Sequence, residues 1–219
     1  EKLPGGLKPL SDSIHALGMQ FGLWVEPEMI SPDSDLYRAH PDWCLHAADR
    51  PRSTRRNQLV LDMSRTDVQD YLIDTITHVL GSAQIEYVKW DMNRNFAEAG
   101  SSLLPPHRQG EVHHRYMLGL YRVMEEITTR FPHILFESCA AGGGRFDAGM
   151  LYYMPQTWTS DDSDAVERLI ELLTLSPLQK EKEFCLRAEF VRTKRKSSDE
   201  QNHFYGTKAS CKFRRFEST

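Results

Sequence analysis

The sequence of 219 residues excludes several classes of protein through what it lacks. No apolar stretch approaches the roughly 20 residues that a membrane-spanning helix needs, so we expect no membrane partner. The first residues lack the charged and then apolar layout of a signal peptide, and there is no initiator methionine. We therefore expect a fragment of a longer, cytoplasmic protein.

Cysteine is scarce and shows neither a metal-binding nor a disulfide pattern. Cys44, Cys139, Cys185 and Cys211 form no CxxC pair and have no zinc-ligand spacing. We interpret them as free thiols of a reducing compartment. The histidines also show no ligand spacing at strand ends, so the sequence disfavours a metal-dependent hydrolase.

Positive charge is sparse over most of the chain. Residues 1–176 carry a net charge of −9, whereas residues 177–219 carry +5. An acidic body with paired carboxylates and tryptophans suits a neutral polar ligand such as a sugar, because a nucleic acid would require clustered lysine and arginine. We predict a catalytic domain over residues 1–171 and a basic, divergent tail over residues 172–219, disordered or non-native. A nucleic-acid arm is the weaker interpretation of that tail.

Apolar segments alternate with amphipathic helical patterns along the acidic body. The spacing predicts helices over residues 6–17, 66–80 and about 110–130. It predicts strands near Phe21, Leu59, Val88, Leu135 and Gln156. This alternation is typical of a parallel sheet covered by helices. Strands that end in polar or acidic residues favour a (β/α)8 barrel over an open doubly wound sheet, so the sequence predicts a partial barrel with about five of the eight strands.

Carboxylates follow the predicted strands closely. Glu26 and Glu28 follow the first one, where they either cap the next turn or serve a site. Asp62 follows the second and precedes a helix opening, so local capping or pairing is its favoured role. Asp91 ends the run Lys89-Trp90-Asp91. It is either a catalytic acid at a barrel rim or a strand-end carboxylate that binds loop amides.

Three consecutive glycines follow the strand near Leu135. Gly142-Gly143-Gly144 permits backbone angles that other residues resist and leaves amide groups free to face a ligand. The spacing matches neither the Walker loop nor the dinucleotide fingerprint, so it supports phosphate binding only weakly.

Five motifs carry a resemblance to a known family. They are Phe21-Gly22-Leu23-Trp24-Val25-Glu26-Pro27-Glu28-Met29, Arg56-Asn57-Gln58-Leu59-Val60-Leu61-Asp62, Lys89-Trp90-Asp91-Met92-Asn93-Arg94, Glu137-Ser138-Cys139 with its glycines, and Trp158-Thr159-Ser160-Asp161-Asp162. In this order, over about residues 4–169, they resemble the catalytic domain of glycoside hydrolase family 36 α-galactosidases.

The resemblance implies roles for particular residues. Asp91 matches the family's nucleophile, and Asp161 matches its acid/base. The residues that match sugar contacts are Trp24, Arg56, Lys89, Asn93, Cys139, Gly142 and Trp158. It further implies no metal or organic cofactor, a small-molecule carbohydrate substrate and homo-oligomeric full-length relatives. Without it, Trp24 and Trp158 are ordinary core aromatics and Cys139 is an inert buried thiol.

The chemistry of these residue types agrees with the resemblance. A retaining glycosidase needs two carboxyl groups about 5 to 5.5 Å apart: one attacks the anomeric carbon, and the other protonates the leaving oxygen and then activates water. Lys89 lies on the same strand face as Asp91 and either keeps it ionised or binds sugar hydroxyls. Asp161, next to Trp158 and other acids, is expected to be desolvated and to retain a proton.

The predicted reaction is retaining hydrolysis of terminal α-linked galactose from raffinose-type oligosaccharides, galactolipids or galactomannan ends. The chain lacks the family's Asp-Asp-Gly-Trp stretch, which holds the 4- and 6-hydroxyls, so we expect it to be poorly active alone. The alternatives are a related α-glycosyl specificity, such as α-N-acetylgalactosaminidase or galactosyl transferase, and a non-catalytic sugar-binding stub.

Overall fold

Four of the apolar segments form one parallel sheet in the computed structural model, which describes residues 3–162, 164 and 166. The strands β1 (Gly22–Val25), β4 (Tyr87–Asp91), β5 (Leu135–Cys139) and β6 (Gln156–Thr157) stand in the order β1-β4-β5-β6, and each neighbouring pair is parallel. The predicted α/β class with a parallel sheet is therefore confirmed. The predicted tail over residues 172–219 and the domain boundary at residue 171 lie outside the described residues.

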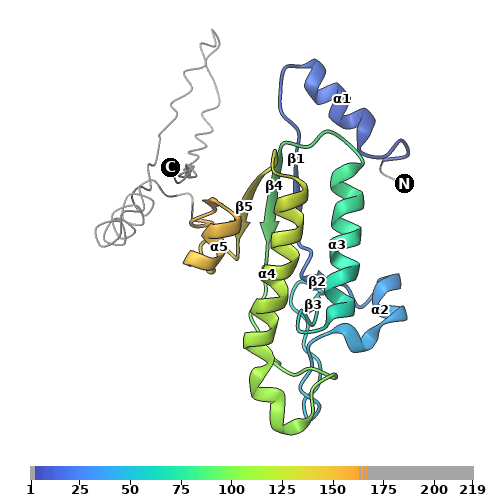
Figure 1. The fold of residues 1–219 in the computed structure, drawn as a ribbon, viewed down its shortest axis with the longest axis vertical. Helices are drawn as coiled ribbons and strands as arrows, with labels where there is room; N and C mark the ends of the chain where they lie inside the picture. The colour runs from blue at the N-terminus through green and yellow to red at the C-terminus, as the bar shows by residue number, and fades with distance from the viewer. Residues whose placement is uncertain (1–2, 163, 165, 167–219) are drawn as a thin grey trace, which may run out of the picture.

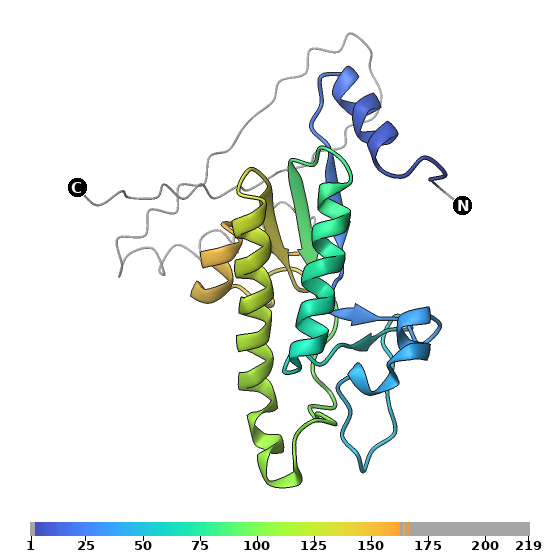
Figure 2. The ribbon, with the colours of Figure 1, turned by 45° about the vertical axis from the view of Figure 1, so that its right-hand side comes forward.

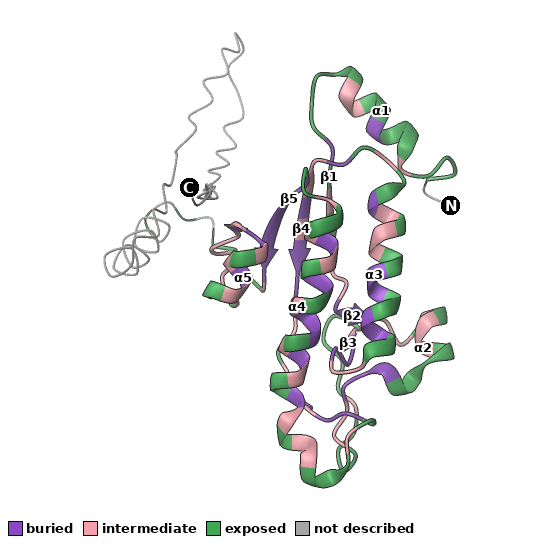
Figure 3. Cartoon of the chain, viewed as in Figure 1, coloured by how far each residue is buried: buried purple, intermediate pink, exposed green. Residues whose placement is uncertain are grey.

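Two long helices lie along this sheet (Figure 1). The helix α3 (Thr66–Gly81) precedes β4, and α4 (Val112–Arg130) leads from β4 toward β5. They lie side by side in both ribbon views (Figure 2), and each buries one side while it exposes the other (Figure 3). Both helices match the predicted spacing, as does α1 (Lys8–Ala16). Within the described residues, no helix is long and apolar enough to cross a membrane.

The prediction of a fifth parallel strand near Leu59 is wrong. The strand β3 (Leu59–Val60) pairs antiparallel with β2 (Met29–Ile30), in a separate two-stranded sheet. A turn at Pro27, closed by the Met29 amide donating to the Glu26 carbonyl at 3.2 Å, brings the chain back toward this segment. A short apolar run identifies a buried strand but not the edge that it joins.

Short helices were not predicted because they have too few residues to show a period. They are α2 (Asp35–Ala39), α5 (Ala148–Tyr153) and the 3-10 helices η1 (Pro41–Trp43) and η2 (Pro106–Glu111). Side-chain caps start two of them: Ser34 accepts from the Tyr37 amide at 3.1 Å, and Asp147 accepts from the Gly149 and Met150 amides.

The core lies between the helices and the strands. Val88, Trp90 and Phe136 are at most 3% exposed and belong to one hydrophobic core with buried residues of α3 and α4. Gly119 of α4 lies against the backbone of Met63, where a Cβ would overlap the Met63 carbonyl oxygen. Because successive side chains of a strand point to opposite faces, the alternate residues of the strands face the other side of the sheet.

Candidate active site

Polar residues occupy the side of the sheet that the helices do not cover. The strand register places Trp24 of β1 beside Lys89 of β4, and Lys89 beside Glu137 of β5. Two residues further along these strands, Asp91 lies beside Cys139. These residues come from separate parts of the sequence and meet because the carboxyl ends of parallel strands lie at one edge of the sheet.

Asp91 is the most highly bonded carboxylate of this row. It is 5% exposed, and its Oδ2 accepts from the Trp24 indole Nε1 at 3.1 Å. Its Oδ1 accepts from the Met92 amide at 2.9 Å, and the side chains of Asn93 and Cys139 also donate to the carboxylate. Burial opposes ionisation, but these bonds outweigh it and lower the pKa of Asp91. Asp91 is thus an ionised carboxylate held by three side chains as well as by a loop amide.

Cys139 stands directly beside Asp91. Its thiol is 2% exposed, and burial raises its pKa to about 11, although the Gly142 amide that donates to it acts in the opposite direction. A neutral thiol can donate to a carboxylate. Cys139 therefore contacts Asp91 as a hydrogen-bond donor, and it is buried, as its sequence alone also suggested.

Lys89 contacts Glu137 and Trp158, and its predicted binding of sugar hydroxyls stays a prediction. Its Nζ lies 3.8 Å from Glu137 Oε1 and 4.1 Å from the centroid of the Trp158 ring. The bonds that hold Asp91 ionised come instead from Trp24, Asn93, Cys139 and the Met92 amide. Lys89 thus connects the strand that bears Asp91 to the segment that bears Asp161.

Asp161 lies after β6, in an exposed segment. Its Oδ1 accepts from the Trp158 indole Nε1 at 2.9 Å. The desolvation expected around Asp161 is not found within the described residues. The Trp158 ring contacts both Lys89 and Asp161, so it is a shared surface of the site and not a core aromatic.

The glycine-rich loop supports the segment of Asp161. The Gly143 amide donates to the Thr159 carbonyl at 2.8 Å, instead of facing a ligand as predicted. Gly142 has φ +86°, and a Cβ there would lie 3.1 Å from the Ser160 Cα. Only glycine meets both conditions without strain. Gly142 also donates to Cys139, so this loop contacts both acid-bearing segments.

Arg56 occupies a strained turn. Arg55 and Gln58 exchange both backbone hydrogen bonds, at 3.2 and 3.0 Å, and Arg56 and Asn57 between them have φ of 54° and 58°. Positive φ at both central residues is typical of a type I′ hairpin turn. The sequence did not predict this turn, because neither central residue is glycine. Strain of this kind persists where the surroundings determine the conformation.

The Glu26 carboxylate accepts hydrogen bonds from side chains of this turn. Its Oε1 lies 3.2 Å from Arg56 Nη1 and accepts from Asn93 Nδ2 at 2.6 Å, while Oε2 accepts from Gln58 Nε2 at 3.2 Å. The side chain is 7% exposed. Of the two roles left open by the sequence, the structure favours service to the site, because these donors are side chains of distant segments and not the amides of the next turn.

Glu28 forms a separate buried cluster on the helix side of the sheet. Its carboxylate is fully buried and accepts from Trp90 Nε1 at 2.9 Å and from the Tyr116 hydroxyl at 2.5 Å. Arg145 Nη1 lies 2.8 and 3.0 Å from its two oxygens. Burial acts to lower the pKa of Arg145, but the charge and hydrogen bonding of Glu28, together with Tyr116, hold that pKa above its ordinary value. Sequence reasoning did not identify Arg145, and no local pattern marks it.

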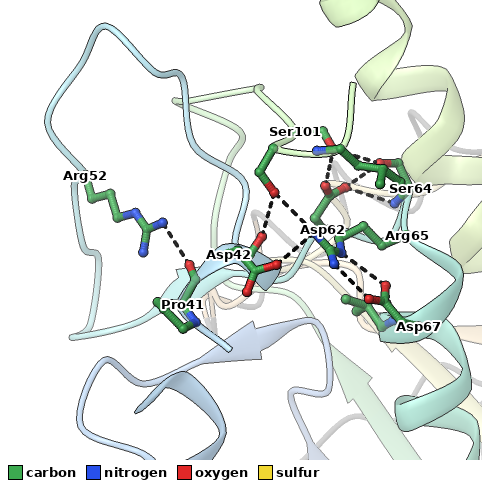
Figure 4. A network of polar contacts seen from close by, with 11 residues as sticks. Pro41, Asp42, Arg52, Asp62, Ser64, Arg65, Asp67 and Ser101 are labelled. Carbon is green, nitrogen blue, oxygen red and sulfur yellow. Dashed lines mark hydrogen bonds and ion pairs between the residues drawn. The ribbon is translucent and has the colours of Figure 1, made fainter. Parts of the chain in front are cut away.

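Asp62 has the structural role that the sequence favoured. It is fully buried and accepts from the Ser64 amide and hydroxyl, at 3.0 and 2.6 Å, and from the Ser101 hydroxyl (Figure 4). Nearby, Arg65 pairs with Asp42 at 3.0 Å. The bond from Ser101 holds the loop after β4 against the segment after β3, and the Arg65–Asp42 pair holds that segment against η1. The described residues contain no group of three or more His, Cys, Asp or Glu that could hold a metal ion.

Fold and site together define an α/β protein whose polar residues gather at the carboxyl ends of parallel strands. Comparison of the sequence with known protein families identifies the protein more narrowly than the fold does. Residues 1–178 match the model of the Melibiase family, and the chain belongs to this family. The resemblance to glycoside hydrolase family 36 α-galactosidases is confirmed by the relatives.

The chain is 73% identical over 168 residues to α-galactosidase AgaA of Geobacillus stearothermophilus, covering 77% of this chain and 23% of that enzyme. It is 54% identical to α-galactosidase 1 of Pediococcus pentosaceus, with the same coverage. The crystal structure of AgaA matches with a TM-score of 0.77 and 70% identity over 79% of this chain and 24% of that chain. The α-galactosidase structure from Lactobacillus brevis matches with a TM-score of 0.77 and 51% identity over 80% of this chain and 24% of that chain. The chain thus spans about a quarter of the length of these relatives.

Proposed function

We propose that the chain is part of a retaining α-galactosidase that releases terminal α-linked galactose from oligosaccharides by double displacement. The observation that carries this proposal is the ionised, highly bonded Asp91 at the carboxyl end of a parallel strand in a member of the Melibiase family. Structures of AgaA variants are described in complex with raffinose and with stachyose. We therefore propose raffinose-type sugars as the substrate class.

Asp91 is the proposed nucleophile. A carboxylate with a lowered pKa is deprotonated at neutral pH and can attack an anomeric carbon without a separate base. Trp24 and Asn93, which donate to it, also restrict its orientation. Trp24 is 51% exposed and offers an apolar ring surface for the C–H face of a sugar.

Asp161 is the proposed acid/base. Its bond from Trp158 and the bond from the Gly143 amide to the Thr159 carbonyl support this assignment, because they restrict its segment. Protonation of the leaving oxygen needs a carboxylic acid. We propose that Asp161 becomes desolvated only when further chain and the bound sugar cover its segment.

The fold that we propose for the complete protein is a (β/α)8 barrel, of which the described residues supply four parallel strands. Among the described residues, β1 and β6 each pair with one parallel neighbour, and a closed barrel would give each a second. Unpaired edges and an incomplete sugar-binding site reduce the precision of the catalytic geometry. We therefore propose that this chain alone is poorly active or inactive.

An assay of the chain on an aryl α-galactoside, beside Asp91→Asn, tests these proposals. We expect little or no turnover by the chain. Robust turnover that Asp91→Asn abolishes would overturn the inactivity proposal and support Asp91 as the nucleophile. Robust turnover that Asp91→Asn leaves unchanged would overturn the role of Asp91.

A non-catalytic sugar-binding role is the second candidate, and the half-exposed Trp24 beside a carboxylate favours it. Calorimetry with galactose, combined with product analysis, separates binding without cleavage from hydrolysis. The same product analysis with N-acetylgalactosaminides and with sucrose as acceptor tests the neighbouring specificities.

A further inference from the structure

We propose that Glu26 is a positioning residue of the site, which holds Arg56 and Asn93 in place with one carboxylate. The proposal rests on the function proposed above, since it takes the Asp91 side of the sheet as the site. Neither oxygen of Glu26 is assigned to the reacting atoms.

The contacts of Glu26 join three distant segments. Glu26 follows β1, Arg56 stands in the turn before β3, and Asn93 follows β4. Both of these partners bond to the same oxygen, Oε1, at 3.2 and 2.6 Å. The other oxygen accepts from Gln58 at 3.2 Å. Since each oxygen has a protein donor and the side chain is only 7% exposed, Glu26 is placed to orient other residues and not to bind a sugar hydroxyl.

The bond to Asn93 selects the orientation of an amide. Asn93 Nδ2 donates to Glu26 at 2.6 Å, and hydrogen bonding from the same side chain is one of the causes that lower the pKa of Asp91. An asparagine side chain presents either an NH2 donor or a carbonyl acceptor to a given neighbour. A carboxylate at Glu26 favours the donor, which also leaves an N–H for Asp91. A neutral amide at position 26 would remove that preference and permit the Asn93 carbonyl to face Asp91.

Glu26 also bonds to Arg56, a residue with an unfavourable backbone conformation. Arg56 has a φ of 54°, which a residue with a side chain adopts at a cost. Its guanidinium reaches Glu26, the carboxylate with which it forms an ion pair, and its side chain remains 52% exposed. One charged bond at the base of the turn thus leaves the remaining guanidinium donors available toward solvent or substrate.

Nuclear magnetic resonance of the full 15N-labelled chain can test this role without turnover. The readout is the exchange of the Asn93 side-chain amide protons with water in the wild type, in Glu26→Gln and in the matched control Gln58→Ala. Loss of a charge-assisted bond is expected to accelerate exchange roughly tenfold to a hundredfold in Glu26→Gln. Gln58→Ala removes a donor from the same carboxylate but spares Oε1, so exchange should stay within about twofold of the wild type.

Exchange that is unchanged in Glu26→Gln, or equally fast in Gln58→Ala, would overturn the proposal whether or not the chain is active. If Glu26→Gln does not fold, Glu26→Asp replaces it. Its carboxylate is one methylene shorter, so unchanged exchange of Asn93 in that variant would also refute the role.

If the chain turns over an aryl α-galactoside, kcat/KM adds a second readout. Glu26→Gln should lower kcat/KM about tenfold or more, and the same substitution should cost a smaller factor in an Asn93→Ala background, where only the bond to Arg56 is left to lose. Multiplying losses would indicate independent structural effects and would contradict positioning through Asn93. An inactive wild-type chain counts against turnover by this fragment alone, and the exchange experiment then decides the role of Glu26.

Discussion

Replacement of Glu28 by glutamine should unfold the chain at a much lower urea concentration. Glu28 is fully buried, and its carboxylate accepts from Arg145, Trp90 and Tyr116. Glutamine keeps the shape but removes the charge. The remaining two donor nitrogens of Arg145, Nε and Nη2, are buried and have no hydrogen-bond partner among the described residues, so no other contact compensates for the lost ion pair.

The expected size of the effect follows from the geometry. Removal of one partner from a buried ion pair typically costs about 3–5 kcal/mol, because the other charge stays buried and unpaired. The glutamine oxygen can still accept from Trp90 or Tyr116, so we expect about 3 kcal/mol, the lower end. This is a large share of the roughly 5–15 kcal/mol by which proteins are stable. With a urea m-value of about 2 kcal/mol/M, the unfolding midpoint should fall by roughly 1.5 M.

Urea unfolding followed by circular dichroism measures this shift, with Asp12→Asn as the matched control. Asp12 pairs with Lys8 at 2.7 Å, but the two side chains are 58% and 70% exposed. An exposed pair contributes about 0–1 kcal/mol, so the control should shift the midpoint by less than about 0.5 M. Glu28→Gln combined with Arg145→Met should recover more than half of the loss, because it removes the unpaired charge. A Glu28→Gln midpoint no lower than that of Asp12→Asn would refute the reasoning and would indicate that Arg145 is hydrated.

Three further predictions concern packing, pH and thiol reactivity. Gly119→Ala should lower the free energy of unfolding by about 1–3 kcal/mol or more, because the new Cβ overlaps Met63. The control Gly81→Ala should be neutral or slightly stabilising, because a Cβ there meets nothing within 4 Å. Equal urea midpoints of the two variants would contradict this prediction. The folded-state pKa of Asp91 is lowered, so its contribution to stability should be fully present above about pH 4 and should be lost as pH falls through that lowered pKa. Asp91→Asn should therefore flatten the acid limb of a curve of unfolding free energy against pH. An unchanged limb would argue against the assigned bonds. Since burial raises the pKa of Cys139 to about 11, iodoacetamide should modify this thiol at neutral pH only when the chain unfolds. Mass spectrometry of the peptide that contains Cys139 measures the labelling, and rapid labelling in the folded chain would disprove the burial.

Local sequence patterns predicted the elements whose stability depends on a repeated apolar face. The helices α1, α3 and α4 have enough turns to show that period. The strands β4 and β5 were identifiable because each is a short apolar run that ends in polar residues. The position of Asp91 at a strand end was therefore predictable, and the family resemblance added the assignment of its partner, Asp161.

The pairing of β3 and the partners of the loop acids were not predictable in this way. A run such as Leu59–Val60 is buried in either a parallel or an antiparallel arrangement, and a distant turn at Pro27 decides between them. The strand period places Lys89 on the face of Asp91, but it does not show that Glu137 of the neighbouring strand lies 3.8 Å from the Lys89 Nζ. Partners across a sheet depend on register, which a single strand does not specify.

The segment Glu26-Pro27-Glu28 illustrates how two acids two residues apart acquire separate tasks. If this segment continued as a strand, both side chains would lie on one face, but the turn at Pro27 sends them to opposite sides of the sheet. Glu26 bonds to Asn93 and Arg56 on the side of Asp91, and Glu28 bonds to Trp90, which precedes Asp91 in the same strand, on the side of the helices. The same loop therefore fixes both faces of the strand that carries the proposed nucleophile. Loss of Glu28 should mainly reduce stability, because it leaves the buried charge of Arg145 without an ion-pair partner among the described residues. Loss of Glu26 should mainly change the geometry of the site.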